Sequence, residues 1–197
     1  MRTNGRIASV LCSAMTGSEL NKKRKWGEND VAVEMQRMAT AHYAIAKAEP
    51  GKLGYVKLNK ILWYSDLEHY RWHGVSITGL KHYTRTPWGP MSREISRAVF
   101  CLVKERKVAE RTKVSKYPGI EMISLERPDF AALTAEQIDI IDQMTEIITP
   151  LTVNQLIQMT RDDRLWQELK NHEAMPVGTG SVITLRPTSL ATSEGSH

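Results

Sequence analysis

The segment Thr86-Pro87-Trp88-Gly89-Pro90 constrains the fold of this 197-residue chain more than any other. Proline fixes its own backbone φ and has no N–H to donate, so two prolines in five residues exclude a regular helix and a central strand. The segment must therefore form a loop between the helical patterns on either side. A tryptophan in such a loop is suited to protein recognition, although the same side chain could instead cover the core.

Apolar residues recur at helical spacing in five stretches, which predicts five helices. The predicted ranges are 30–48, 56–73, 91–107, 134–148 and 152–169, the last with an interruption at 161–164. Asp30 is the expected N-cap of the first helix, and Gly74 is expected to end the second. Thr134 and Thr152 each begin a capping box.

Strand patterns are fewer and shorter. Alternation over 108–114, a Tyr-Pro-Gly turn at 117–119 and a return over 120–125 predict a hairpin, and 81–85 predicts one short strand. The expected fold class is therefore α+β and mostly α, with about five helices and a small antiparallel two- or three-stranded element.

Composition divides the chain into three parts. Residues 1–29 predict a flexible basic leader, 30–175 a single domain and 176–197 a flexible tail. The first 30 residues carry six basic and three acidic side chains, out of a net charge of +5 for the chain. Because the remainder is close to neutral, charge gives no indication of a large nucleic-acid-binding face.

Cysteine content and hydropathy favour a soluble cytoplasmic protein. Cys12 and Cys101 are the two cysteines and form no disulfide framework. No apolar run approaches the roughly 18 residues of a membrane span. We therefore expect no membrane association.

No catalytic, metal or cofactor site is expected. The sequence has no glycine-rich phosphate loop and no nucleophile elbow, and Cys101 lies in an apolar helical stripe. His69 and His73 stand four residues apart, with His82 as a third metal ligand, but the glutamate of the metallohydrolase helix motif is missing. A metal-dependent enzyme remains an alternative that bound zinc would favour.

A winged-helix DNA-binding regulator is a second alternative. Three helices followed by a hairpin match the order of its elements, and the third helix carries Arg93 and Arg97 among other basic residues. A helix-turn-helix, however, needs a turn of about three or four residues before its recognition helix. Here the whole of 75–90 intervenes.

Two motifs resemble a known family. The run Lys57-Leu-Asn-Lys-Ile-Leu-Trp-Tyr64 is similar to the second-helix signature of the Panacea domain of SocA-like antitoxins, found in bacteria and their phages. Thr86-Pro-Trp-Gly-Pro-Met91 resembles the loop of that family. The likeness extends over about 31–175 and includes Trp166, but Thr160-Arg161 stands where the family often has Ser or Thr followed by His.

The resemblance implies an antitoxin, not an enzyme. Members of the family neutralise unrelated protein toxins by direct contact, and in the SocA-like branch the antitoxin is an adaptor that hands its toxin to a Clp protease. A cognate toxin encoded nearby is the implied partner, and a homo-oligomer stays open. We expect the toxin-binding surface to comprise Tyr83, Arg85, Trp88 and Arg93, with Gly89 and Pro90 shaping the loop and Lys57, Lys60 and Tyr64 supporting it from beneath.

Overall fold

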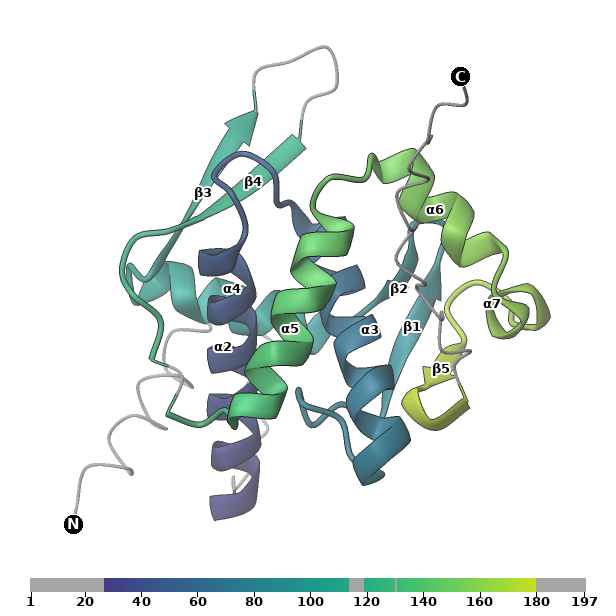
Figure 1. Ribbon diagram of the computed structural model, residues 1–197, viewed down its shortest axis with the longest axis horizontal. Helices are drawn as coiled ribbons and strands as arrows, with labels where there is room; N and C mark the ends of the chain where they lie inside the picture. The colour runs from purple at the N-terminus through teal and green to yellow at the C-terminus, as the bar shows by residue number, and fades with distance from the viewer. Residues whose placement is uncertain (1–26, 114–118, 130, 180–197) are drawn as a thin grey trace, which may run out of the picture.

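The computed structural model describes residues 27–113, 119–129 and 131–179. These residues form a helical body flanked by two small antiparallel sheets, which confirms the predicted mostly helical α+β class (Figure 1). The helices are α2 (Glu28–Lys47), α3 (Tyr55–His73), α4 (Arg93–Lys104), α5 (Ala135–Ile148), α6 (Val153–Arg161) and α7 (Arg164–Glu168). The strands are β1 (His82–Thr86), β2 (Gly89–Met91), β3 (Val108–Lys113), β4 (Gly119–Ser124) and β5 (Ala174–Pro176), and a 3-10 turn, η1, spans Val177–Thr179.

Helix α3 lies at the centre of the body. It packs against α2 and α5 on one side and against β2, α6 and η1 on the other. Leu58, Ile61 and Leu62 on this helix are fully buried, as their period predicts. Gly74 ends the helix in the left-handed conformation at φ 69°, which a residue without a Cβ adopts at no steric cost.

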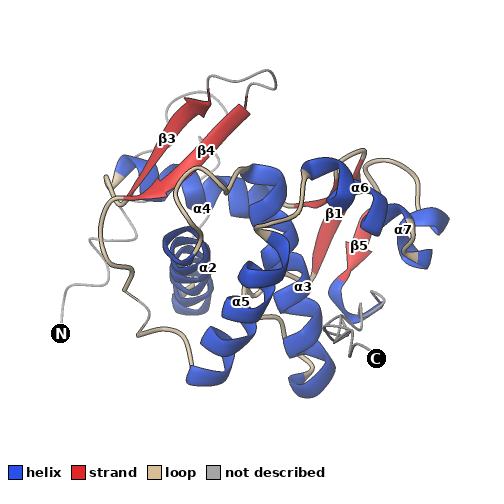
Figure 2. Cartoon of the chain, turned by 45° about the horizontal axis from the view of Figure 1, so that its top comes forward, coloured by secondary structure: helices blue, strands red, loops and turns tan. Residues whose placement is uncertain are grey.

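The two sheets lie on opposite sides of the helices (Figure 2). Strands β3 and β4 form a hairpin in the register of the predicted alternation, with Val108 opposite Ser124. The second sheet has the order β2-β1-β5. Its edge strand β2 contains Gly89 and Pro90, which agrees with the confinement of proline to edge strands. The predicted turn at 117–119 lies mostly outside the described residues.

Two local predictions were wrong, and a third was confirmed. Gly27, not Asp30, is the N-cap of α2, and Asp30 instead accepts a hydrogen bond from the Gly27 N–H. The interruption predicted at 161–164 is confirmed: it divides the fifth stretch into α6 and α7, and Asp163 caps α7 by accepting from the Leu165 N–H at 2.8 Å. Strands β2 and β5 were missed, since three residues are too few to show a period of two.

The described helices contain none long and apolar enough to cross a membrane. The predicted leader and tail fall for the most part outside the described residues, so their boundaries stay predictions. Strands β1 and β2 stand between α3 and α4, and this arrangement leaves no short helix-turn-helix connection there.

Candidate functional site

The loop predicted from its two prolines is a tight turn between β1 and β2. Thr86 pairs with Gly89, which leaves Pro87 and Trp88 at the tip. The Thr86 hydroxyl accepts from the Trp88 N–H at 3.2 Å and donates to the Gly89 carbonyl at 2.8 Å. The Trp88 side chain is 55% exposed. The structure therefore resolves the alternative left by the sequence: this indole points away from the core and is held on a hydrogen-bonded frame.

Arg85 braces the outer side of the turn. Its Nε donates to the Trp166 carbonyl at 2.9 Å, and its guanidinium lies 3.7 Å from the centre of the Trp166 ring. A further guanidinium N–H donates to the Asn171 side chain. The Trp166 indole N–H in turn reaches the Thr86 carbonyl at 3.4 Å. Arg85 thus ties β1 to α7, and three of its contacts are internal to the molecule.

Lys60 lies directly beneath the turn and is fully buried. Gly89 has φ 104°, and a Cβ at that position would lie 2.1 Å from the Lys60 Nζ and 3.1 Å from the Thr160 Oγ1. Glycine is therefore required at position 89 both by its backbone and by the ammonium group below it. Burial lowers the pKa of Lys60 from 10.5 to about 7, although the charge of Asp163 acts to raise it.

Tyr64 and Lys57, the two other residues predicted to support the loop, have different surroundings. Tyr64 is buried and shares a side-chain hydrogen bond with Thr160, and burial raises its pKa. Tyr64 therefore belongs to the layer beneath the turn. The Lys57 Nζ donates to the Thr149 carbonyl at 2.5 Å, at the C-terminal end of α5. Lys57 is thus held by α5 rather than by the turn.

Tyr83 is part of the core, which corrects its prediction as a surface contact. It is fully buried, its ring meets Trp63 edge-on at a centroid distance of 5.0 Å, and its hydroxyl donates to Asp66 at 2.8 Å. Strand alternation explains the difference: Tyr83 faces inward, as its period-two position in β1 requires. The sequence alone could not distinguish a tyrosine of the core from one at an interface, because the large apolar ring suits both.

Asp66 is the centre of this buried hydrogen-bond network. Besides the Tyr83 hydroxyl it accepts from the Thr78 N–H at 2.9 Å and from the Thr78 hydroxyl at 2.5 Å. Burial raises the pKa of Asp66 to about 6, although these hydrogen bonds act to lower it. The network joins α3 to the loop before β1 and so fixes the strand that carries the Trp88 turn.

Arg93 lies on the other side of the site, as the exposed first residue of α4. Its position is set by Ser92, whose N–H donates to the Asn59 side chain of α3 at 2.9 Å. Gly89 and Pro90 are buried in β2. The structure therefore brings Trp88 and the residues beneath it together, and adds three that the sequence did not single out for this site: Thr160, Asp163 and Asn171.

His69 and His73, the two histidines of the predicted metal pair, both have partners within the protein. His69 Nδ1 lies 2.7 Å from the Val75 carbonyl, and His73 Nε2 lies 3.0 Å from a Glu136 carboxylate oxygen. Over 27–113, 119–129 and 131–179, no group of three or more His, Cys, Asp or Glu side chains is arranged to hold a metal ion. That part of the chain therefore contains no assembled metal site.

Comparison with protein families identifies the family of the chain. The pattern of the SocA-like antitoxin family, Panacea domain, matches residues 58–167. The match spans most of α3, the Trp88 turn, α6 and most of α7. The chain belongs to the family of SocA-like antitoxins. Comparisons with curated proteins and with solved structures find no match.

Proposed function

We propose that this protein is the antitoxin of a toxin–antitoxin pair and neutralises its cognate toxin by direct contact centred on the Trp88 turn. The observation that carries the proposal is the exposed indole of Trp88 on a turn held by the Thr86 hydroxyl and braced by Arg85. Tryptophan on a rigid frame is typical of the few residues that contribute most of the binding energy of an interface. Membership of an antitoxin family supplies the class of partner.

A contact surface of the usual size, about 800 Å² per partner, would extend from the turn to neighbouring residues. Arg93 is exposed at the start of α4, and Arg161 and Arg164 are exposed at the α6–α7 junction beside Thr160. Arginine is enriched at interfaces because its planar guanidinium forms several hydrogen bonds at once. We expect these arginines to border the contact made by Trp88.

Co-expression with the product of the neighbouring gene tests the proposal. That product should stop growth when induced alone, and growth should return when this protein is induced with it. Trp88→Ala should weaken the complex by about 2 kcal/mol, roughly 30-fold in Kd. Absence of both toxicity and a complex would contradict the antitoxin assignment.

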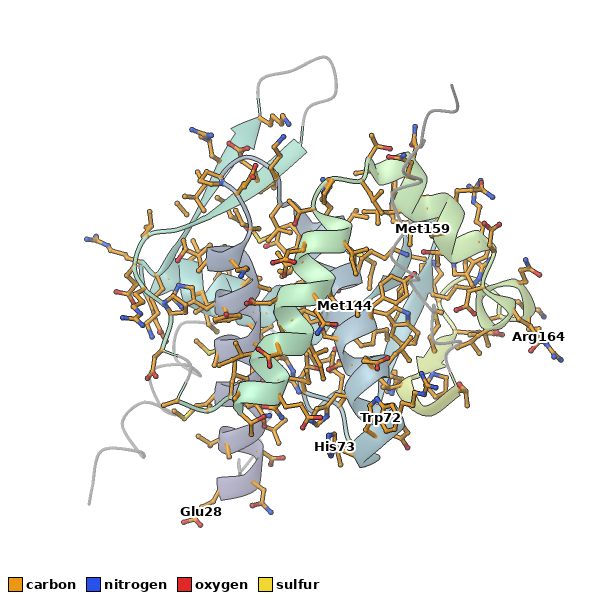
Figure 3. All side chains as sticks on the ribbon, in the orientation of Figure 1. Glu28, Trp72, His73, Met144, Met159 and Arg164 are labelled. Atoms are coloured by element: carbon orange, nitrogen blue, oxygen red, sulfur yellow. The ribbon has the colours of Figure 1, made fainter. Side chains whose placement is uncertain are left out.

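Trp72→Ala is the matched control. Trp72 is 67% exposed and lies at the C-terminal end of α3, next to His73 (Figure 3). Its indole N–H donates to Glu68 on the same helix, so its loss leaves the Trp88 turn intact. Its replacement should leave the affinity for the toxin unchanged. Equal losses in the two variants would contradict the assignment of the surface to Trp88.

Delivery of the toxin to a Clp protease is the finer part of the proposal. The SocA-like membership supports it. The half-life of the toxin, followed after translation is stopped, should shorten when this protein is present and the protease is intact. A half-life that is the same with and without the protease would favour simple sequestration.

A further inference from the structure

Lys60 is enclosed without a hydrogen-bond acceptor. Its Nζ has no hydrogen-bond partner among the described residues, and the whole side chain is buried. Asp163 acts on it through space without forming an ion pair with it. A buried ammonium in this state is unfavourable, because water no longer solvates it and no carboxylate replaces the water. An acceptor that reached the Nζ would therefore gain more than it would at an exposed lysine.

The residue that separates the Lys60 Nζ from the surface belongs to the Trp88 turn. The Nζ lies against Gly89, a residue with no side chain, at the position that a Cβ would otherwise fill. The residue before Gly89 is the exposed Trp88. Beyond the backbone pairing of β1 with β2, the turn is held by the hydroxyl of Thr86 and by the Trp166 indole N–H, which donates to the Thr86 carbonyl. A partner that packs on the Trp88 indole is thus one residue away from the buried cation.

We infer that Lys60 is a receptor for a carboxylate of the toxin, which reaches the Nζ when the bound toxin displaces the turn at Gly89. This inference rests on the proposed function. A carboxylate fits because it supplies opposite charge and lone pairs to an ammonium that has three donors and no acceptor. Asp163 does not exclude it, since charge–charge energies fall with distance and the new oxygen would be in direct contact.

The titratable groups around Lys60 make the binding of a carboxylate to its Nζ measurable. Among the described residues around Lys60, the titratable groups are Asp163, before α7, and Tyr64, on α3; Gly89, Pro90 and Thr160 bring none. Burial lowers the pKa of Lys60 to about 7 and raises that of Tyr64. At pH 8.5 free Lys60 is therefore mostly neutral, and a carboxylate bound to it would restore its proton.

Calorimetric titration of the full-length protein with the product of the neighbouring gene tests the inference. At pH 8.5, in two buffers of different ionisation enthalpy, the wild type should take up about one proton per complex. Lys60→Met should take up none and should bind about tenfold more weakly or worse. Lys81→Met, at an exposed residue before the other end of β1, is the control and should behave as the wild type.

The possible outcomes separate the two proposals. A wild-type complex that forms without proton uptake would overturn the carboxylate receptor and leave the antitoxin function standing. This measurement needs no variant, so it holds even if Lys60→Met folds poorly. No complex at all would contradict the antitoxin function, and the receptor with it. Single Asp→Asn and Glu→Gln changes in the toxin, beside a form with an amidated C-terminus, should identify the carboxylate by the loss of proton uptake.

Discussion

Asp66 and Lys60, two buried ionisable side chains of helix α3, differ in their hydrogen bonding. Asp66 accepts three hydrogen bonds, from the Thr78 N–H, the Thr78 hydroxyl and the Tyr83 hydroxyl. Lys60 is equally buried but has no hydrogen-bond partner among the described residues. Burying either charged group costs free energy of desolvation. Hydrogen bonds therefore offset part of the cost of burying Asp66, whereas no hydrogen bond within the described part of the chain offsets the burial of Lys60.

The comparison also bears on the layout of the proposed recognition surface. The Asp66 network fixes the start of β1 through Tyr83, whereas Lys60 lies beneath the far end of the hairpin, at Gly89. The start of β1 is thus held by hydrogen bonds to Asp66, whereas the turn between β1 and β2 packs on Lys60, whose ammonium has no hydrogen-bond acceptor in the part of the chain that the structure describes. Functional sites commonly keep such locally unfavourable features, because stability and binding make different demands on the same residues.

The largest expected effect follows from removing the anchor. Asp66→Ala leaves two hydroxyls and one backbone N–H without their acceptor in the core, and should lower the free energy of unfolding by about 3 kcal/mol or more. Urea denaturation measures it. Asp142→Ala is the control: its carboxylate accepts from Tyr43 and Lys47 at a partly exposed position and should cost about 1 kcal/mol or less. Similar losses in both variants would contradict the special role of the buried network.

A smaller effect should link the turn to Lys60. Gly89→Ala places a Cβ against the Nζ and strains a backbone at φ 104°, and should cost about 2 kcal/mol. Lys60→Met ends one atom short of the ammonium, so in that background the same change should cost less by about 0.5 kcal/mol or more. A double-mutant cycle from thermal or urea unfolding measures this coupling. Strictly additive losses would show that the two residues do not meet.

The smallest expected effect is on the pH dependence of stability. The Lys60 pKa falls from 10.5 in the unfolded chain to about 7 in the fold. Between these values the unfolded state binds more protons, so the free energy of unfolding should rise as pH increases above 7, by up to about 1.4 kcal/mol per pH unit. Lys60→Met should lack this rise and should be the more stable protein at pH 7.

Unfolding curves at pH 7, 8 and 9 for the two proteins would show the difference. We expect the wild type to gain about 1 kcal/mol on the variant over this range. This figure is set below the limit because the effective dielectric constant inside a protein is higher than that of a dry interior, which weakens the effect of burial. A constant gap would mean that Lys60 keeps its proton in the fold, and that Asp163 compensates for its burial.

Much of the fold was predictable because its signals are local. The capping boxes at Thr134 and Thr152 begin α5 and α6 as predicted, with both side chains accepting the expected backbone hydrogen bonds. The periodicity of α3 and the stop at Gly74 were also confirmed. Of the site, the Trp88 turn could be predicted, because its prolines exclude other structures. The role of Tyr83 could not, since a tyrosine at that position suits either a core or an interface.

The sequence by itself determined the helices, the β3–β4 hairpin and the presence of a rigid turn with a tryptophan at its tip. Each depends on residues within a few positions of one another, so backbone sterics and local hydrogen bonds suffice. Only the tertiary structure decided that Lys60 is buried without an acceptor, that Gly89 covers it and that Thr160 and Asp163 lie beside it. These residues come from α3, β2, the end of α6 and the N-cap of α7, and they meet only because the packing of the core brings those elements together.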